Sequence, residues 1–276
     1  MKYKLLAPEN MSNWKIQFTK AYADLTEGLA KWNIWLRLSW FAVREKYRRS
    51  MLGPFWITLS TAVMVLTFGV LYGKLLGEKL SEHLPYVACG IVIWLFYSES
   101  LVRGCHIFIT NGRMIQQLPL PLSVHLYHFV SKELITLAHN FVIIILIFMF
   151  FMKGVGFYAI YSLIGLALIV VNALSVALIF GVISVRFRDF PLIVQAIMRP
   201  MMFLTPIIWS AKSYPDRSFF IDWNPFYHIV EIFREPLLGN IPSAKSWIIV
   251  LLITFVSCAT AFVLFARYRH RIAYWV

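Results

Sequence analysis

The sequence predicts an all-α integral membrane protein with six transmembrane helices. The 276-residue chain is 60% hydrophobic and has a mean hydropathy of +0.70, outside the range of soluble globular proteins. Six apolar segments are long enough to cross ~30 Å of hydrocarbon at ~1.5 Å per residue. They run over residues 54–73, 84–105, 124–152, 157–185, 191–210 and 247–266. An even number of crossings places both ends of the chain on the same side of the membrane.

The charges are distributed by side. Residues 1–52 hold ten Lys and Arg against four acidic residues, and the tail at 267–271 adds three Arg, whereas the charges of 211–246 balance. This asymmetry is typical of cytoplasmic ends and of attraction to anionic lipid head groups, and it argues against nucleic acid as the reason for the net charge of +13. We expect residues 1–28 to form a cytoplasmic N-terminal segment and residues 29–276 one membrane domain.

Before the first span, residues 29–47 show the pattern of an amphipathic helix. Apolar side chains recur at the spacing of one helical face. They are Leu29, Trp32, Leu36, Trp40, Val43 and Tyr47. Three tryptophans favour a helix in the head-group layer with a second side packed on the bundle; an ordinary cytoplasmic helix is the alternative. Four cations between Arg44 and Arg49 then meet a charge-free run from Pro54 to Leu71, which holds that end of the first span in the cytoplasm.

The connections between the spans are short. Residues 153–156 predict a tight outside hairpin, because glycine tolerates the positive φ of such a turn. On the inside, residues 111–117 form a compact segment that Pro119 and Pro121 terminate before the third span. A second inside loop centres on residues 186–191.

The outside segment 211–246 predicts a short helix. Asn224 and Pro225 suit an N-cap and a first helical position, an apolar stripe follows, and Pro236 and Gly239 end it. About a dozen residues cannot cross a bilayer. We therefore expect an interfacial or re-entrant helix at the outer mouth, before the last span.

Several ionisable residues lie inside the apolar segments. Glu99 and Arg103 are four residues apart, the spacing of an intrahelical ion pair, and both a structural role and a transport role stay open. Glu133 on the third span can pair with a neighbouring helix. Arg199 lies ~12 Å into the fifth span. Either it satisfies backbone carbonyls that two prolines of that span free, or it faces a pathway for an anionic substrate.

Aromatic residues make up 17% of the chain. Their rings stack on the apolar faces of sugars, while Tyr and Trp also hydrogen-bond hydroxyl groups; an interfacial aromatic belt is the alternative. The candidates for contact with a cargo in a channel are Trp94, Tyr97, Arg199, Trp209, Phe226 and Tyr227.

Catalytic and metal-binding motifs are absent from the sequence. It holds no G-x-x-x-x-G-K-[ST] phosphate loop, no G-x-S-x-G motif, and three unclustered cysteines without metal-ligand spacing. We therefore expect no enzyme activity, no metal and no cofactor, so any driving energy comes from a partner. An ion-coupled transporter would need inverted repeats and midplane acids, and a membrane enzyme would need a catalytic cluster.

Five strings resemble one known family. They are RRSMLGPFWITLS at 48–60, LPYVACGIVIW at 84–94, LTPIIW at 204–209, NPFYHIVEIFREPLLG at 224–239 and RIAYWV at 271–276. Together they resemble the membrane (permease) subunit of ABC-type polysaccharide exporters, most closely the O-antigen (lipopolysaccharide) export permeases. The resemblance runs from about Trp32 to the end of the chain. Capsule and teichoic acid exporters of the same fold are the alternative.

The resemblance implies a homodimer in the bacterial inner membrane, with both termini cytoplasmic and two copies of a separate subunit that binds ATP and Mg. Its cargo would be a polysaccharide linked to a lipid pyrophosphate. Residues 29–47, with Trp32, Leu36, Trp40 and Tyr47, would be an interfacial gate helix, and residues 211–239 would be periplasmic gate helices. The loop that couples to the ATPase would consist of Asn111, Gly112, Arg113, Met114, Ile115, Gln116 and Gln117. Met114 and Ile115 would offer apolar contacts to the partner, and the first and fifth spans would form the channel wall.

Overall fold

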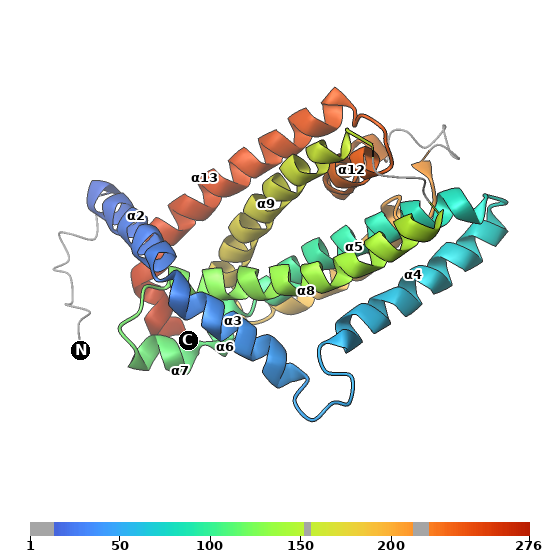
Figure 1. Cartoon of the computed structure of the whole chain (residues 1–276). Coiled ribbons are helices and arrows are strands. Elements are labelled where there is room, and N and C mark those ends of the chain that lie inside the picture. The colour runs from blue at the N-terminus through green and yellow to red at the C-terminus, as the bar shows by residue number, and fades with distance from the viewer. Residues whose placement is uncertain (1–13, 152–155, 212–220) are drawn as a thin grey trace.

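The computed structural model describes residues 14–151, 156–211 and 221–276, and these ranges fold into helices joined by turns (Figure 1). In chain order the helices are α2 (Trp14–Ala30), α3 (Trp32–Lys46), α4 (Phe55–Leu75), α5 (Leu80–Gly104), α6 (Ile107–Thr110), α7 (Gly112–Gln117), α8 (Ser123–Phe151), α9 (Ala159–Arg186), α10 (Phe190–Leu204), α12 (Pro225–Leu237) and α13 (Ala244–Trp275). This all-α architecture confirms the predicted fold class.

Five of these helices are long and apolar enough to cross a membrane, namely α4, α5, α8, α9 and α13. They coincide with five of the six predicted spans to within a few residues, except that α13 continues through the basic tail to Trp275. At 29 and 28 residues, α8 and α9 exceed the length that a bilayer needs, as expected. Most of the predicted hairpin at 153–156 lies outside the described residues.

The fifth predicted span, 191–210, is shorter than expected. The apolar helix α10 has 15 residues, or about 22 Å at 1.5 Å per residue, less than a bilayer thickness. Thr205 adopts an extended conformation at φ −92° and ψ 134°, because a residue that precedes proline avoids the helical region. Pro206 therefore ends the helix, whereas the sequence predicted that the span continues to residue 210.

The N-terminal helices also differ from the prediction. The stretch 29–47 is not one helix: the chain breaks at Lys31, where φ is −83° and ψ is 35°, so that Leu29 belongs to α2 and α3 starts at Trp32. The earlier helix α2 packs against α13 and α8. Its residue Gly28 lies so close to Ser123 that any side chain there would collide with it. The predicted boundary after residue 28, between an N-terminal segment and the membrane domain, stays a prediction.

The bundle is built around α5. This helix contacts α4, α8, α9, α10 and α12, and 72% of its apolar window is buried. The C-terminal residues, α2 and α7 lie at one end of the bundle, whereas α12 lies at the other end among α9, α13 and α5 (Figure 1). That arrangement agrees with an even number of crossings, and it gives the molecule two distinct ends.

Candidate functional site

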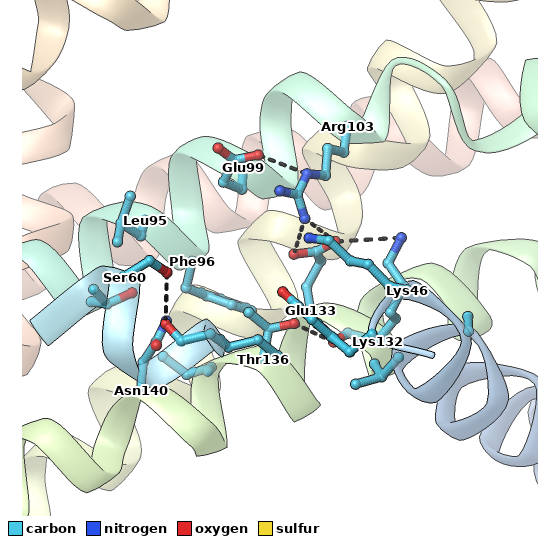
Figure 2. A pocket seen from close by; sticks show the side chains of 16 residues that line it. Lys46, Ser60, Leu95, Phe96, Glu99, Arg103, Lys132, Glu133, Thr136 and Asn140 are labelled. Carbon is cyan, nitrogen blue, oxygen red and sulfur yellow. Dashed lines mark hydrogen bonds and ion pairs between the residues drawn. The ribbon is translucent and has the colours of Figure 1, made fainter. Parts of the chain in front are cut away.

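A pocket of about 520 Å³ opens between the C-terminal part of α3 and the helices α4, α5 and α8 (Figure 2). Its lining is rich in charged and polar side chains from all four helices. They include Lys46 on α3, Ser60 and Thr61 on α4, Glu99 and Arg103 on α5, and Lys132, Glu133, Thr136 and Asn140 on α8. A polar cavity inside apolar helices is a default candidate for a functional site.

Arg103 is the centre of the charges in this pocket. Its Nε lies 2.7 Å from Glu99, which confirms the predicted intrahelical pair, and its NH1 lies 3.4 Å from Glu133 on α8. Figure 2 shows Arg103 reaching from α5 towards both carboxylates. Glu133 is only 2% exposed and also lies 3.7 Å from Lys132, so the pairing predicted for Glu133 across helices is confirmed.

The pocket carries an excess of positive charge. Lys46, Arg103 and Lys132 face two carboxylates, Glu99 and Glu133. The buried Oδ1 of Asn140 finds no hydrogen-bond donor among the described residues, although buried polar atoms ordinarily have one. The site can therefore accommodate an anionic group together with a hydroxyl donor.

The helix α3 forms one edge of this pocket. Trp32, Leu36 and Trp40 are 55%, 40% and 51% exposed, so this part of the predicted apolar stripe faces outward, as a helix in a head-group layer requires, whereas Val43 of the same stripe is buried. The opposite side contacts α8 through Ser39, whose Oγ donates to the carbonyl of His128 at 2.8 Å. Sequence reasoning did not identify Ser39, because a lone serine carries no signal of burial. Tyr47 lies after the helix and lines the pocket.

The predicted coupling loop forms a short helical turn at the end that carries the termini. Asn111 precedes α7, and its side chain donates to the Ile107 carbonyl at 2.7 Å. Arg113, Gln116 and Gln117 are exposed and Met114 is half-buried. Ile115 is 1% exposed and packs in the core, so Met114 alone of the two apolar residues is accessible to a partner. The coupling role of this loop stays a prediction.

Three of the aromatic candidates meet in the core. Trp94 and Tyr97 are nearly fully buried, and both rings pack edge-on against Phe226, at 5.6 and 6.1 Å between centroids. The hydroxyl of Tyr97 donates to Asn172 at 2.6 Å. Within one chain these rings therefore connect α12 with α5, and a contact with cargo stays a prediction.

The other candidates are not part of this cluster. Trp209 donates its indole N–H to the Phe203 carbonyl at 3.0 Å, and the hydroxyl of Tyr227 donates to Glu231 at 3.3 Å. Arg199 is exposed on α10. It does not satisfy the backbone that Pro206 frees, so this part of the prediction for Arg199 is wrong, whereas its exposed position keeps the alternative of an anionic pathway open.

Arg234 on α12 binds the irregular backbone after α10, at the carbonyl of Pro206 itself. Its NH1 donates to the Pro206 carbonyl at 2.7 Å, its NH2 donates to Glu231 at 2.7 Å, and its guanidinium lies 3.7 Å from the ring centroid of Tyr86. Irregular backbone at membrane depth is tolerated where protein groups satisfy it. Sequence analysis missed Arg234, although its position four residues after Val230 places it on the apolar face of α12.

Known proteins are similar to this chain over most of its length. The family described as ABC-2 type transporter matches residues 35–238. The O-antigen export system permease protein RfbA of Klebsiella pneumoniae is 20% identical over 237 residues, which are 84% of this chain and 90% of that protein. The polysialic acid transport protein KpsM of Escherichia coli is 24% identical over 242 residues, which are 83% and 90% of the two chains. The family match starts within α3 and ends directly after α12, so it contains the pocket, α7 and Arg234.

Proposed function

The chain belongs to the ABC-2 type transporter family, and on that premise we propose that it is the permease subunit of an ATP-driven exporter that moves lipid-linked polysaccharide out of the cytoplasm. Two kinds of relatives support this cargo. RfbA is named for the export of O-antigen and KpsM for the transport of polysialic acid, so both act on polysaccharides. O-antigen is the first candidate cargo, in agreement with the resemblance in the sequence.

The pocket beside α3 is the observation that carries the proposal. It lies at the end of the spans where the basic N-terminal region enters the bundle. With that end in the cytoplasm, as we propose, the pocket would be accessible to the head group of a lipid in the cytoplasmic leaflet. Its three cations, Lys46, Arg103 and Lys132, suit a phosphate, and its hydroxyl and amide groups suit a sugar. The outward tryptophans of α3 would guide the lipid to this opening.

The energy for export would come from a separate subunit. The sequence contains no phosphate loop, so ATP and Mg would be bound by two copies of an ATP-binding subunit that docks at α7. A second copy of this chain would complete the channel, with α4 and α10 as its wall. Both helices flank α5 and expose apolar side chains, which supports that assignment. The complex would reside in the bacterial inner membrane with both termini in the cytoplasm.

The decisive experiment measures export and its energy source together. Lipid-linked polysaccharide is added to the outer leaflet of inverted membrane vesicles that contain the permease and its ATP-binding subunit. The polymer that becomes protected inside the vesicles is then quantified. We expect uptake to stop when ATP is withdrawn while the proton gradient is maintained. Uptake that follows the proton gradient and ignores ATP would show an ion-coupled transporter instead.

A capsular polysaccharide is the second candidate cargo, because KpsM is about as similar to this chain as RfbA. Complementation separates the two. The chain and its ATP-binding subunit are expressed in one strain that lacks its O-antigen permease and in another that lacks its capsule permease. Restored surface O-antigen without restored capsule is the expected result, and the reverse would assign capsule export.

A further inference from the structure

The last residues of α13 contact both of the connections that lie at the terminal end of the bundle. Gln116 on α7 donates its Nε2 to the backbone oxygen of Val276 at 3.1 Å. Arg188, in the loop between α9 and α10, donates its NH2 to the backbone oxygen of Trp275 at 2.8 Å. Figure 1 shows the C-terminal residues beside α7. Residues 272–276 therefore lie between two segments that are about 70 residues apart in the chain.

Side-chain packing strengthens this connection. A Cβ at Gly112 would lie 3.1 Å from the Cβ of Val276, so glycine permits the close approach of α7. The ring of Trp275 packs 5.8 Å from the ring of Tyr268, and the Arg186 guanidinium lies 5.7 Å from it. Ile272 and Ile115 are buried in the same core. Close packing of this kind transmits displacement from one segment to the next.

We propose that residues 272–276 brace α7 and the 187–189 loop into one rigid unit, the terminal platform, through which the ATP-binding subunit drives the permease. The proposal rests on the proposed function. The segment that contains α6 and α7 joins α5 to α8, and the 187–189 loop joins α9 to α10. A push on α7 alone would move the first pair, whereas a braced platform moves both pairs and α13 together.

The outward face of the platform has a definite chemistry. Arg113, Arg186, Arg188 and Arg271 are exposed in or directly beside the platform segments, and Asp189 is the acidic residue among the described residues of these segments. Phe187 and Tyr274 are 63% and 71% exposed. A basic surface with two exposed rings is complementary to an acidic rim around an apolar floor, so this is the surface that the ATP-binding subunit would present.

Substitutions at two adjacent residues distinguish bracing of the platform from docking of the ATP-binding subunit. The ring of Trp275 packs against Tyr268 and the Arg186 guanidinium, whereas Tyr274 is 71% exposed, so their alanine variants form a matched pair. In Trp275→Ala we expect the ATP-binding subunit to co-purify and hydrolyse ATP as in the wild type, while polymer exported per ATP falls about tenfold, within the usual range of coupling free energies. In Tyr274→Ala we expect less bound subunit and an unchanged ratio of export to hydrolysis. Wild-type export in Trp275→Ala, or a loss of bound subunit like that of Tyr274→Ala, would overturn the brace.

A cross-link provides the second test, and it also decides the matter if Trp275→Ala fails to accumulate. Gly112→Cys and Val276→Cys are combined in a chain without Cys89, Cys105 and Cys258, because their Cβ separation is close to the ~3.8 Å of a disulfide. Since the platform moves as a unit, oxidation should leave export unchanged. Export that is lost on oxidation and recovered on reduction would show that α7 and the tail separate during transport. Each single-cysteine chain is the control. ATP-independent export by the unsubstituted chain would refute the proposed function. This outcome differs from both results of the cross-link, which concern only the platform.

Discussion

Two short helices lie at opposite ends of the bundle, and they are attached in different ways. At one end α12 is buried on both flanks, and Arg234 fixes it to the irregular backbone at Pro206 and to Tyr86. At the other end α3 exposes Trp32, Trp40 and Phe41. The side-chain hydrogen bonds that join α3 to the bundle, within the described ranges, come from Ser39.

The difference has a physical consequence. A buried guanidinium has directional bonds, and its displacement leaves several polar groups without partners, so α12 holds one position. Apolar contacts are not directional, and they allow a helix to slide at little cost. The comparison indicates that α12 is a fixed part of its end of the bundle, whereas α3 is suited to move beside the pocket that it borders.

The largest expected effect comes from Arg234→Met. The substitution removes the charged donor of the Pro206 carbonyl and of the half-buried Glu231, and each acceptor keeps only a longer bond of 3.3 Å from a tyrosine hydroxyl. It should lower stability by about 3–5 kcal/mol, as the loss of one partner from a buried charged network does. Thermal unfolding of the detergent-solubilised protein measures it. Arg199→Met is the matched control, because Arg199 is exposed, and its effect should stay within about 0.5 kcal/mol. Equal effects would remove the basis for calling α12 fixed.

Asp24→Asn tests whether α2 is attached like α12 or like α3. The Asp24 carboxylate accepts the backbone N–H of Leu122 and of Ser123, at 3.3 and 3.0 Å, and pairs with Arg269 at 3.0 Å. Loss of these charge-assisted bonds should cost about 1.5–3 kcal/mol. The same unfolding measurement applies, with Glu27→Gln as the control, since Glu27 forms an exposed pair with Lys31. A small effect at Asp24 would group α2 with α3 as a loosely attached helix.

Ser39→Ala should have a smaller effect on stability, about 1 kcal/mol, because the hydrogen bonds of the Ser39 hydroxyl to His128 are between neutral groups. Its effect on transport is more informative. If α3 moves during export, the loosened helix should keep exporting, so the rate should change less than it does in Arg234→Met at equal protein amounts. A complete loss of export in a stable Ser39→Ala protein would show that α3 must be held in place, which contradicts the comparison.

The sequence predicted α12 well, because its ends depend on local chemistry. The Asn224 side chain accepts from the Phe226 N–H at 3.0 Å as an N-cap, and Gly239 has the φ of +87° that ends a helix. The anchors of the fold depend instead on contacts between distant residues. Nothing near Asp24 in the chain indicates that it caps α8, 99 residues later.

The same distinction explains the errors. Proline in the fifth span indicates a disturbed helix, but whether the helix ends there depends on partners for the irregular backbone. The donor that binds the Pro206 carbonyl is Arg234, 28 residues away on α12. Arg199 and Arg234 each lie in a helix that has an apolar stripe, and the sequence does not say which of the two is buried. Only the packing of α12 against α5 and α9 distinguishes the exposed arginine from the buried one.

The smallest effect on stability, and the sharpest test of α3, comes from Lys46→Gln. Lys46 is exposed at the end of α3 and supplies one of the three cations of the pocket, so its loss should change stability by less than about 0.5 kcal/mol. The affinity for a phosphate-bearing cargo should nevertheless fall about fivefold, as the loss of one partly screened charge contact of about 1 kcal/mol predicts. The concentration of lipid-linked polysaccharide at half-maximal uptake measures this in vesicles. Lys31→Gln is the control, because Lys31 lies at the far end of α3 and pairs with Glu27 instead. If the concentration at half-maximal uptake changes in Lys46→Gln alone, α3 carries part of the cargo site, and movement of α3 is coupled to binding of cargo. If the two variants behave alike, α3 takes no part in binding cargo at the pocket.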